Sequence, residues 1–577
     1  MPSFALPLAL ALVAAVPLSG QAVALVDARG HIDLGRYYTA AETNQILEEY
    51  AALYPDLIAV QEIGRSYLGA PLMVATLTNR ATGPAHEKPA LYVDGGLHAA
   101  ELTGSSVATH LLAHLLSGYG SDPRVTRLLD ESVFYIRPKF APDGSDLVLR
   151  EDQPLRSSVR PVDNDLDGVP DDDPPQDLNG DGWITQMRVP DPEGPWYADP
   201  DDPRVMLRVP SDGSLPQGAR RYRTESEGLD DDGDGRIDED GIGGLDLNRN
   251  FPRNWEREHL QPGAGDFPLS EPETYAAVRF LHDHRNITGI VHGHTSGGFV
   301  YRLPSASAPS LFPTDDLALI EHLGAEYTRT TGRPVRPSAT HPTEHRYGTL
   351  ISWGYWDQGV IGWVPEYSPG PEMWVPDYDG DGRISESEEL RYDDEELGGR
   401  YFVEWTPIDH PTLGAVEVGG WKTRFWGQNP PPEHLEEETT PQLPWILYLA
   451  EQAPRLELSA AVASADAGGV EIEARVTNTG FQPTSLTGRG AVGAPNRVVR
   501  PVRLTVELEG AELVEGEARV DIGHLAGTGP FVPEVAERTG GASWTVRATG
   551  PGARVRVVAA SEKAGTVRSE WFDLEGR

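Results

Sequence analysis

Several polar residues stand in or beside apolar or glycine-rich segments, where a solvent-exposed role does not explain them: His98, Glu101, Asn248, Arg249, His294 and Glu366. His98 and Glu101 are three positions apart and follow a predicted strand, so their side chains can converge on one ion. Imidazole and carboxylate groups are both common zinc ligands, and a catalytic zinc takes three protein ligands and keeps one position open. The pair therefore predicts part of a metal site.

Further segments follow the His98 pair in a fixed order, each next to a predicted strand or turn: Pro142 to Gly144 (PDG), Leu245 to Phe251 (LDLNRNF), Ile290 to Thr295 (IVHGHT) and Trp363 to Glu366 (WVPE). Together they resemble the zinc carboxypeptidase family, the funnelin type related to pancreatic carboxypeptidase, over roughly residues 35 to 450. The resemblance implies a mixed eight-stranded sheet flanked by helices, one catalytic Zn²⁺, and peptide substrates with a free C-terminus.

The resemblance also assigns roles to the chemical groups. His98, Glu101 and His294 correspond to the zinc ligands, because the family's third ligand ends an apolar strand and precedes Ser or Thr. His292 stays open as an alternative, since alternation along a strand points both histidines to the same side. Glu366 corresponds to the catalytic glutamate, which accepts a proton from the attacking water and passes it to the departing amine.

Substrate-binding roles follow in the same way. Asn248 and Arg249 match the pair that binds the terminal carboxylate, for which a guanidinium offers two parallel donors. A further arginine polarises the scissile carbonyl in the family, and Arg156 is the best match, with Arg160 as a competitor.

Two residues near Glu366 complete the expected substrate site. Tyr347 fits the mobile tyrosine that closes over bound substrate in the family. If Ile351 takes the position that floors the specificity pocket in relatives, that pocket is apolar. It would then favour apolar or aromatic terminal residues.

Acidic loops form a second group of candidate metal ligands. One loop satisfies the calcium-loop pattern through Asp377, Asp379, Asp381, Arg383 (by its carbonyl) and Glu388 at the twelfth position. Less complete versions lie upstream, with these ligands: Asp163, Asp165 and Asp167; Asp177, Asn179 and Asp181; Asp230, Asp232, Asp234 and Asp238. The sequence therefore predicts structural Ca²⁺ at up to four sites, with solvated acidic loops as the alternative.

Periodicity indicates an α/β unit followed by an all-β unit. Helices are expected near residues 39–53, with Ile46, Leu47, Tyr50 and Leu53 on the buried face, and at 102–116 and 275–284; strands are expected at 72–77, 90–95, 133–136, 287–291 and 360–364. Alternation of strands and helices predicts a sheet covered by helices, which forms a catalytic domain over residues 33–452. Short strand-like runs after Pro454 predict a β-sandwich over residues 455–577.

The segment 150–243 inside the first domain is rich in Asp, Pro and Gly and shows little periodicity. A stretch of that length without regular structure is unusual unless something else orders it. Calcium would provide that order, and Arg156 stands seven residues before Asp163, so the ions could position a wall of the substrate site.

Composition narrows the range of functions. The formal net charge is −41, from 89 acidic and 48 basic residues, which argues against a nucleic-acid partner. The chain has no cysteine, which excludes disulfides and thiolate ligands.

Residues 1–24 are uncharged, apolar from Phe4 to Pro17 and end in Ala-Val-Ala, which predicts a cleaved signal peptide and export to the periplasm or the extracellular space. No later segment has the length of a membrane span.

These patterns favour an exported zinc peptidase that removes C-terminal residues. Two alternatives remain open at this point: a cell-wall peptide peptidase or amidase of the same fold, and a catalytically silent, calcium-stabilised binding protein.

Overall fold

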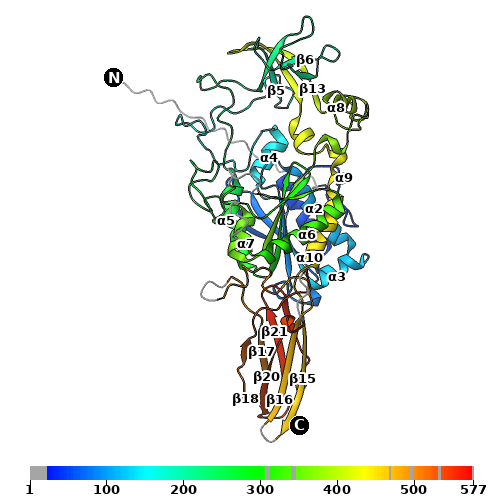
Figure 1. Ribbon diagram of the computed structural model, residues 1–577, viewed down its shortest axis with the longest axis vertical. Helices are drawn as coiled ribbons and strands as arrows, with labels where there is room; N and C mark the ends of the chain where they lie inside the picture. The colour runs from blue at the N-terminus through cyan, green and yellow to red at the C-terminus, as the bar shows by residue number, and fades with distance from the viewer. Residues whose placement is uncertain are drawn as a thin grey trace, which may run out of the picture.

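The computed structural model describes residues 23–305, 312–338, 346–466, 469–493, 498–530 and 535–574. Three units follow one another along its long axis: an antiparallel β unit at one end, a central α/β unit, and a β-sandwich at the other end (Figure 1). Of the expected signal peptide, residues 1–22 lie outside the described residues. Within the described ranges, no helix combines the length and apolarity needed to cross a membrane.

The central unit contains a mixed sheet of eight strands, counted over the described residues, in the order β1-β2-β4-β3-β9-β12-β10-β11. Their bounds in that order are Ile58–Arg65, Pro71–Leu77, Val133–Arg137, Ala90–Gly95, Ile287–Thr295, Ile361–Tyr367, Phe299–Arg302 and Val335–Pro337. The middle strands β4, β3, β9 and β12 are parallel to one another. The α/β class and the eight-stranded sheet expected from the sequence are thereby confirmed.

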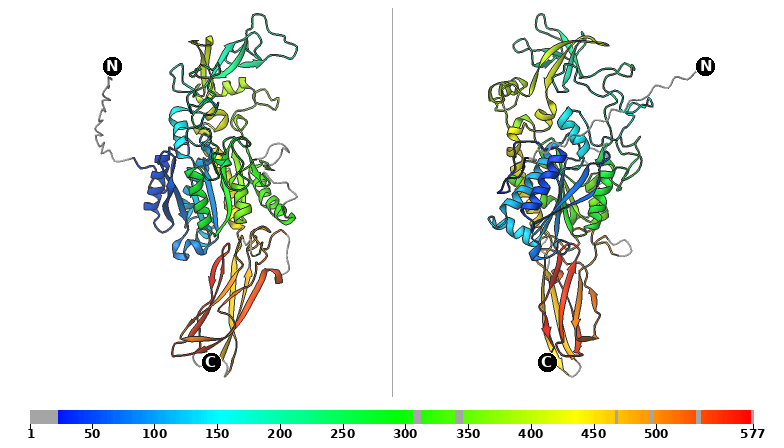
Figure 2. Two further views of the ribbon diagram at one scale, coloured as in Figure 1. Left: turned by 90° about the vertical axis from the view of Figure 1, so that its left-hand side faces the viewer. Right: turned by 180° about the vertical axis from the view of Figure 1, so that it is seen from behind.

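Helices cover both faces of this sheet (Figure 2). One face is packed by α1 (Ala40–Leu53), α2 (Leu102–Gly118), α3 (Pro123–Glu131), α6 (Thr314–Thr331) and α10 (Leu443–Glu451). The other face is packed by α5 (Pro272–Asp283) and α7 (Leu350–Gln358). Strands buried on both sides are expected to be continuous apolar runs, which is why β3, β4 and β12 could be recognised in the sequence.

Two local expectations about this unit are wrong. Leu53 was expected on the buried face of the first helix, but its exposed fraction is 40% because the helix ends there. Pro142, Asp143 and Gly144 are residue types typical of a turn between elements, which the sequence therefore predicts there, but they form the first turn of α4 (Pro142–Glu151). Proline at the first helical position costs no hydrogen bond, since that N–H would have no partner inside the helix.

The Asp-rich segment contains regular structure that its sequence does not reveal. Its strands β5 (Gln186–Pro190), β6 (Trp196–Ala198), β7 (Met206–Arg208) and β8 (Arg221–Ser226) join β13 (Phe402–His410) and β14 (Gly414–Trp421) in one antiparallel sheet. The strands are short, and β5 pairs with a hairpin that lies more than two hundred residues later. Local periodicity cannot show such a pairing, so the expected lack of structure is corrected here.

The remaining helical segments are short connectors. They are α8 (Glu386–Tyr392), α9 (Leu435–Thr439), the 3₁₀ turns Arg80–Thr82, Ala85–Glu87, Leu247–Arg249, Pro371–Met373, Pro432–His434, Thr440–Gln442 and Val535–Arg538, and the π turns Asp393–Leu397 and Arg424–Gln428.

The C-terminal unit packs two antiparallel sheets around one apolar core. The first sheet contains β15 (Leu456–Asp466), β16 (Gly469–Asn478), β20 (Thr539–Ala548) and β18 (Ala511–Glu515); the second contains β19 (Arg519–Asp521), β17 (Arg503–Glu509), β21 (Arg554–Ser561), β22 (Gly565–Arg568) and β23 (Phe572–Asp573). Ile472, Leu504 and Trp544 contribute to the core.

The sandwich also contacts the central unit directly. Lys563 Nζ donates a hydrogen bond to the carbonyl oxygen of Ile287 at 2.8 Å, and Arg568 pairs with Glu87 at 2.6 Å. Because Ile287 begins β9, the sandwich is attached to one of the central parallel strands.

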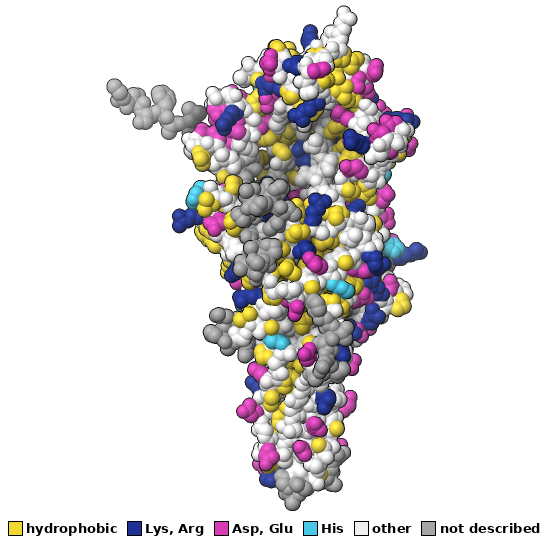
Figure 3. All heavy atoms as spheres, viewed as in Figure 1, with side chains coloured by type: hydrophobic (Ala, Val, Ile, Leu, Met, Phe, Trp, Pro, Cys, Tyr) yellow, Lys and Arg dark blue, Asp and Glu magenta, His cyan; other side chains and the backbone are white. Residues whose placement is uncertain are grey.

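Charged side chains of both signs are interspersed over the face of the molecule seen in Figure 3, on all three units. On that face, the excess of acidic residues is therefore spread along the molecule rather than gathered in one place.

Candidate active site

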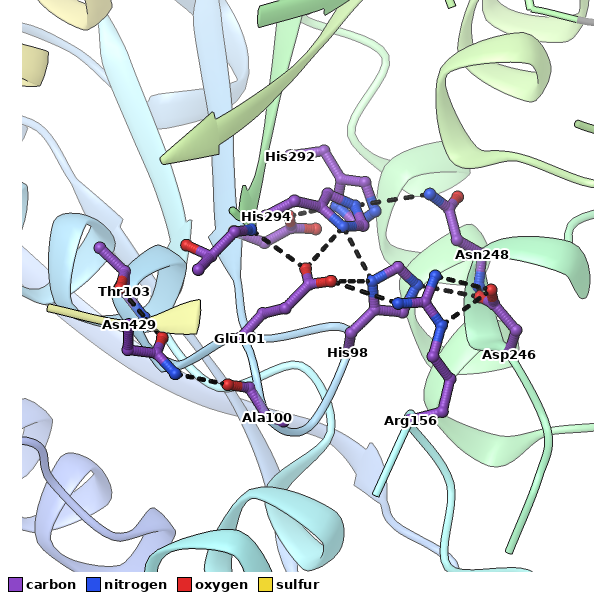
Figure 4. A network of polar contacts seen from close by, with 12 residues as sticks. His98, Ala100, Glu101, Thr103, Arg156, Asp246, Asn248, His292, His294 and Asn429 are labelled. Atoms are coloured by element: carbon purple, nitrogen blue, oxygen red, sulfur yellow. Dashed lines mark hydrogen bonds and ion pairs between the residues drawn. The ribbon is translucent and has the colours of Figure 1, made fainter. Parts of the chain in front are cut away.

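Three ligand-type side chains converge at one edge of the central sheet. His98 Nδ1 lies 2.7 Å from Glu101 Oε1, His294 Nδ1 lies 2.9 Å from Glu101 Oε2, and the two Nδ1 atoms are 3.0 Å apart (Figure 4). Two imidazole nitrogens and a carboxylate that face one common point match the nitrogen and oxygen donors that zinc prefers. The donor set fits a zinc ion.

The sheet topology explains why these residues meet. His98 and Glu101 follow β3, and His294 lies near the end of β9, the parallel neighbour of β3. Helix α2 starts directly against both strand ends: a Cβ atom at Gly95 would lie 2.1 Å from the Gly104 carbonyl oxygen, and one at Gly104 would lie 2.4 Å from that of Gly293. Glycines are therefore required for this close approach.

The electrostatics favour the deprotonated state that a metal ligand needs at two of the three donors, Glu101 and His294. Burial lowers the pKa of His294 to about 3, so this imidazole is neutral. Burial alone would raise the pKa of Glu101, but the two neighbouring imidazoles hold it well below its usual value. For His98, burial is outweighed by Glu101 and Asp246, which raise its pKa. Deprotonated ligands bind metals, so Glu101 and His294 are ready to do so.

Asp246 links the donor cluster to Arg156. Its Oδ1 lies 3.0 Å from His98 Nε2, while its Oδ2 accepts from Arg156 Nη2 at 3.0 Å (Figure 4). Arg156 Nη1 also donates to Glu101 Oε1 at 3.3 Å. A metal-ligating histidine is commonly oriented by a carboxylate on its other ring nitrogen. Asp246 was not among the residues predicted from the sequence, although its place two residues before Asn248 could have indicated it.

The two histidines of β9 have different partners. His292 Nδ1 lies 2.5 Å from Asp94 Oδ1, and both side chains are fully buried. His294 faces Glu101 and His98 instead. The geometry therefore brings His294, and not His292, into the donor cluster.

Glu366 lies beside the cluster because β12 pairs with β9 in a register that sets Glu366 opposite His294. Loss of solvent contact, together with the neighbouring Glu101 carboxylate, raises the pKa of Glu366 to about 8. A carboxyl group with a raised pKa next to a metal-ligand cluster is typical of a general acid or base.

A cavity of about 260 Å³ opens over these groups. It is lined by His98, Glu101, Arg156, Asn248, Arg249, His294, Thr295, Ser296, Phe299, Tyr301, Ser338, Arg346, Thr349, Ile351, Val364 and Glu366. Asn248 and Arg249 lie on the 3₁₀ turn after Asp246, and the Asn248 amide lies 3.4 Å from His294 Nε2. The expected zinc ligands, the expected general base and the residues expected to bind the terminal carboxylate thus line one cavity.

Two further expected residues do not line this cavity. Arg160 pairs with Glu271 at 2.8 Å and with Asp266 at 2.6 Å, away from the donor cluster, whereas Arg156 contacts the cluster. Tyr347 does not line the cavity, although Arg346, the residue before it, does. No sequence signal pointed to Arg346.

The acidic loop at residues 377–388 gathers part of its expected ligand set. Ligand oxygens of Asp377, Asp379 and Glu388 lie within 4.8 Å of one another, and Asp381 is outside that group. The loop closes through backbone N–H groups: Gly382 donates to Asp377 Oδ2 at 2.8 Å, and Tyr378 donates to Glu388 Oε1 at 2.6 Å.

The loops of the Asp-rich segment are combined differently from the sequence expectation. Asp163, Asp165 and Asp167 form one group, but Asp165 also joins Asp232, Asp234 and Glu239 of a second loop. Glu239 was missed, although it belongs to the acidic run 238–240 that follows this loop. Asp230 and Asp238 lie outside the second group. In the Asp177 loop, the backbone N–H of Gly182 donates to Asp177 Oδ2 at 2.8 Å, and the backbone N–H of Asp181 donates to Asn179 Oδ1 at 2.9 Å.

Family models match two parts of the chain. The model of the family described as zinc carboxypeptidase matches residues 43–186 and 213–379, which is more than half of the chain. Residues 455–571 match a domain of unknown function, DUF8731.

Similar curated proteins match over shorter stretches. Carboxypeptidase A2 of Mus musculus is 32% identical over 114 residues, which are 20% of this chain and 26% of that protein. Carboxypeptidase B of Astacus astacus is 29% identical over 127 residues, which are 22% of this chain and 40% of that protein. An inactive metallocarboxypeptidase of Saccharomyces cerevisiae is 34% identical over 91 residues, which are 16% of this chain and 21% of that protein. The match to mouse carboxypeptidase A2 thus spans about a quarter of that protein.

Among solved structures, thrombin activatable fibrinolysis inhibitor is similar with a TM-score of 0.43 and 17% identity, covering 73% of this chain and 76% of that chain.

Proposed function

Because the chain belongs to the zinc carboxypeptidase family, we propose that it is a zinc metallopeptidase that removes C-terminal residues from peptides. The observation that carries this proposal is the convergence of His98, Glu101 and His294 beside Glu366, in a cavity that Arg249 also lines. A metal-ligand set, a general base and a carboxylate-binding arginine are the groups that this reaction requires.

The ligands and the base have separate tasks. Zinc held by the three donors would supply Lewis-acid chemistry, which activates water and polarises a peptide carbonyl. Glu366 accepts the proton of the attacking water and returns it to the departing amine. A pKa of about 8 supports both transfers, because a group that titrates near the working pH can accept a proton and release it again.

The cations of the cavity orient the substrate. Arg249 offers two parallel N–H donors to the terminal carboxylate, with the Asn248 amide next to it. Arg156 is already anchored by Asp246 and Glu101, so its guanidinium is fixed in place and can donate to the carbonyl oxygen of the scissile bond. A pre-oriented donor costs little reorganisation when charge develops on that oxygen.

The acidic loops are proposed to bind structural Ca²⁺. Clusters of carboxylate oxygens within 4.8 Å of one another repel unless a cation neutralises them, and the Asp-rich segment has few apolar contacts of its own. Measuring the calcium content of protein dialysed against Ca²⁺ would test this. Absence of bound calcium at millimolar free Ca²⁺ would contradict it.

Export is proposed from the N-terminal sequence. The apolar segment and its Ala-Val-Ala end support cleavage after Ala24, and a chain without cysteine needs no disulfides outside the cell. N-terminal sequencing of the mature protein should give Leu25 as the first residue, and retention of Met1 would contradict export by this route.

The proposed reaction is tested with peptides supplied both as free acids and as C-terminal amides. Mass spectrometry of each mixture after incubation with the zinc-loaded protein should show stepwise loss of terminal residues from the acids only. Cleavage of both forms would favour an amidase or endopeptidase. Cleavage of neither would favour cell-wall peptides or the silent binding protein; one yeast relative is itself named an inactive metallocarboxypeptidase.

A further inference from the structure

Arg346 is a cation in the cavity that the proposed reaction does not use. Its Nη2 donates to the Tyr301 hydroxyl at 3.3 Å, and its guanidinium carbon lies 4.5 Å from the centre of the Tyr301 ring. Both side chains line the cavity. These two contacts fix the guanidinium against an aromatic wall, so Arg346 is oriented rather than extended into solvent.

Arg346 forms no ion pair with a described residue, although it lies near enough to Glu366 for its charge to oppose the rise in the pKa of that carboxyl. Arg156, by contrast, pairs with Asp246 and Glu101. Arg346 also lies close enough to Arg249 that its positive charge helps to lower the pKa of Arg249. Two like charges facing one small cavity repel, and two anionic groups bound together would remove that repulsion.

Part of the wall is apolar. Ile351 and Val364 line the cavity and are buried, so they offer contacts for methylene groups. The carboxylates that also line it, Glu101 and Glu366, belong to the donor cluster and the proposed base. A volume of about 260 Å³ is sufficient for one amino-acid residue and not for a long peptide. The cavity therefore combines an apolar part with Arg249 and Arg346, while its third arginine, Arg156, is already paired with Asp246 and Glu101.

We propose that Arg346 selects C-terminal residues whose side chain ends in a carboxylate. Arg249 binds the terminal carboxylate, Arg346 binds the side-chain carboxylate, and Ile351 contacts the methylenes between them. Tyr301 is a positioning residue that holds Arg346. This inference rests on the proposed function and replaces the apolar or aromatic preference that Ile351 alone suggested.

The test compares peptides that differ only at the last residue, Glu against Gln and Asp against Asn. Because each pair has the same shape, the ratio of kcat/KM reports the charge. The wild type should prefer the acidic residue by roughly tenfold to 100-fold, the range expected for a charge-assisted hydrogen bond. Arg346→Gln should lose this preference by slowing the acidic substrates only, and Arg346→Lys should retain part of it.

A matched control is Arg336→Gln. Arg336 also stacks on an aromatic ring of β10, with its guanidinium carbon 3.8 Å from the centre of the Phe299 ring, but it does not line the cavity. This variant should keep the acidic preference. If Arg346→Gln did not fold, the ratio measured for the wild type would still decide, since a ratio near one overturns the proposal.

A binding measurement distinguishes the failure of this inference from the failure of the proposed function. Calorimetry on the Glu366→Gln variant measures the affinity of Glu-ended and Gln-ended peptides without turnover. Tighter binding of the Glu-ended peptide, lost when Arg346→Gln is added, supports the inference even if the wild type hydrolyses nothing and the proposed function fails. Equal affinities, or no binding of either peptide, overturn the inference even if hydrolysis occurs.

Discussion

The His98 cluster and the Asp377 loop both gather side chains of the types that bind metal ions, but they do so by opposite means. His98 and His294 are 196 positions apart in the chain and become neighbours only because β3 and β9 are adjacent and parallel. The Asp377 loop takes its ligands from a single short segment, closed by its own backbone N–H groups. The first site depends on the whole fold, whereas the second is a property of local sequence.

Burial separates the two regions as well. His98, Glu101 and His294 have exposed fractions of 5%, 4% and 1%, while Asp377 and Asp379 are exposed. Buried donors cannot relax toward solvent, so their geometry is fixed before any ion binds. A fixed ligand set suits catalysis, and an exposed loop that an ion tightens suits a structural role.

The largest expected effect is the loss of the base. Glu366→Gln keeps the shape of the side chain but cannot accept a proton, so kcat should fall by about 10³-fold, within the usual range for general-base catalysis. Zinc content, measured by elemental analysis, should stay the same. Activity within tenfold of the wild type would remove Glu366 from the proposed role.

Next in size is the loss of the carboxylate-binding arginine. Arg249→Gln removes a charged, two-pronged donor from the cavity, which should raise KM and lower kcat/KM for free-acid peptides by roughly 100-fold. Steady-state kinetics on one acid substrate measures this. An unchanged KM would show that the terminal carboxylate binds elsewhere.

Calcium removal should have a smaller, indirect effect. When the free Ca²⁺ concentration is about 100 times the Kd, each bound ion stabilises the folded state by roughly 2.7 kcal/mol. Removal of the ions should therefore lower Tm by several degrees. Activity should fall several-fold while zinc is retained, because the Asp163 loop lies close in sequence to Arg156. Full activity in zinc-replete, calcium-free buffer would show that the acidic loops act independently of the site. The Glu388→Gln variant, which removes one expected ligand of the Asp377 loop only, is the matched control for loss of a single ion.

The smallest expected effect comes from Lys563, which attaches the sandwich to β9, the strand that carries His294. Burial lowers the pKa of Lys563 to about 7, against about 10.4 in an unfolded chain. Between these values the unfolded state binds more protons, so the stability of the wild type should rise with pH; below pH 7 both states are protonated and this dependence ends.

Lys563→Met lacks this titration. The Tm of the wild type relative to Lys563→Met should therefore increase from pH 7 to pH 10, as followed by thermal unfolding. A constant difference between the two proteins over this range would mean that Lys563 is not buried against Ile287 in solution.

Where rare residue types adjoin apolar strands, the sequence pointed to residues that the fold brings together. His98, Glu101, His294 and Glu366 stood out because polar groups at the ends of buried strands need a reason, and the fold brings all four together. Alternation of strands and helices predicted a sheet covered by helices, whereas its eight strands were implied by the family resemblance.

The sequence did not point to residues that acquire their role only from long-range contacts. Asp246 and Arg346 are ordinary charged residues in loops, and only their three-dimensional neighbours set them apart. The pairing of β5 with β14 and the sharing of Asp165 between two loops are likewise invisible to local patterns. The roles of Tyr347 and Ile351 stay predictions.

Crystallographic anomalous scattering recorded on both sides of the zinc absorption edge tests the division between the two regions most directly. We expect one zinc peak about 2.0 to 2.2 Å from His98 Nδ1, His294 Nδ1 and the Glu101 carboxylate, with calcium density at the acidic loops and no zinc there. Zinc bound at the acidic loops, or its absence from the His98 cluster at saturating zinc, would contradict this expectation.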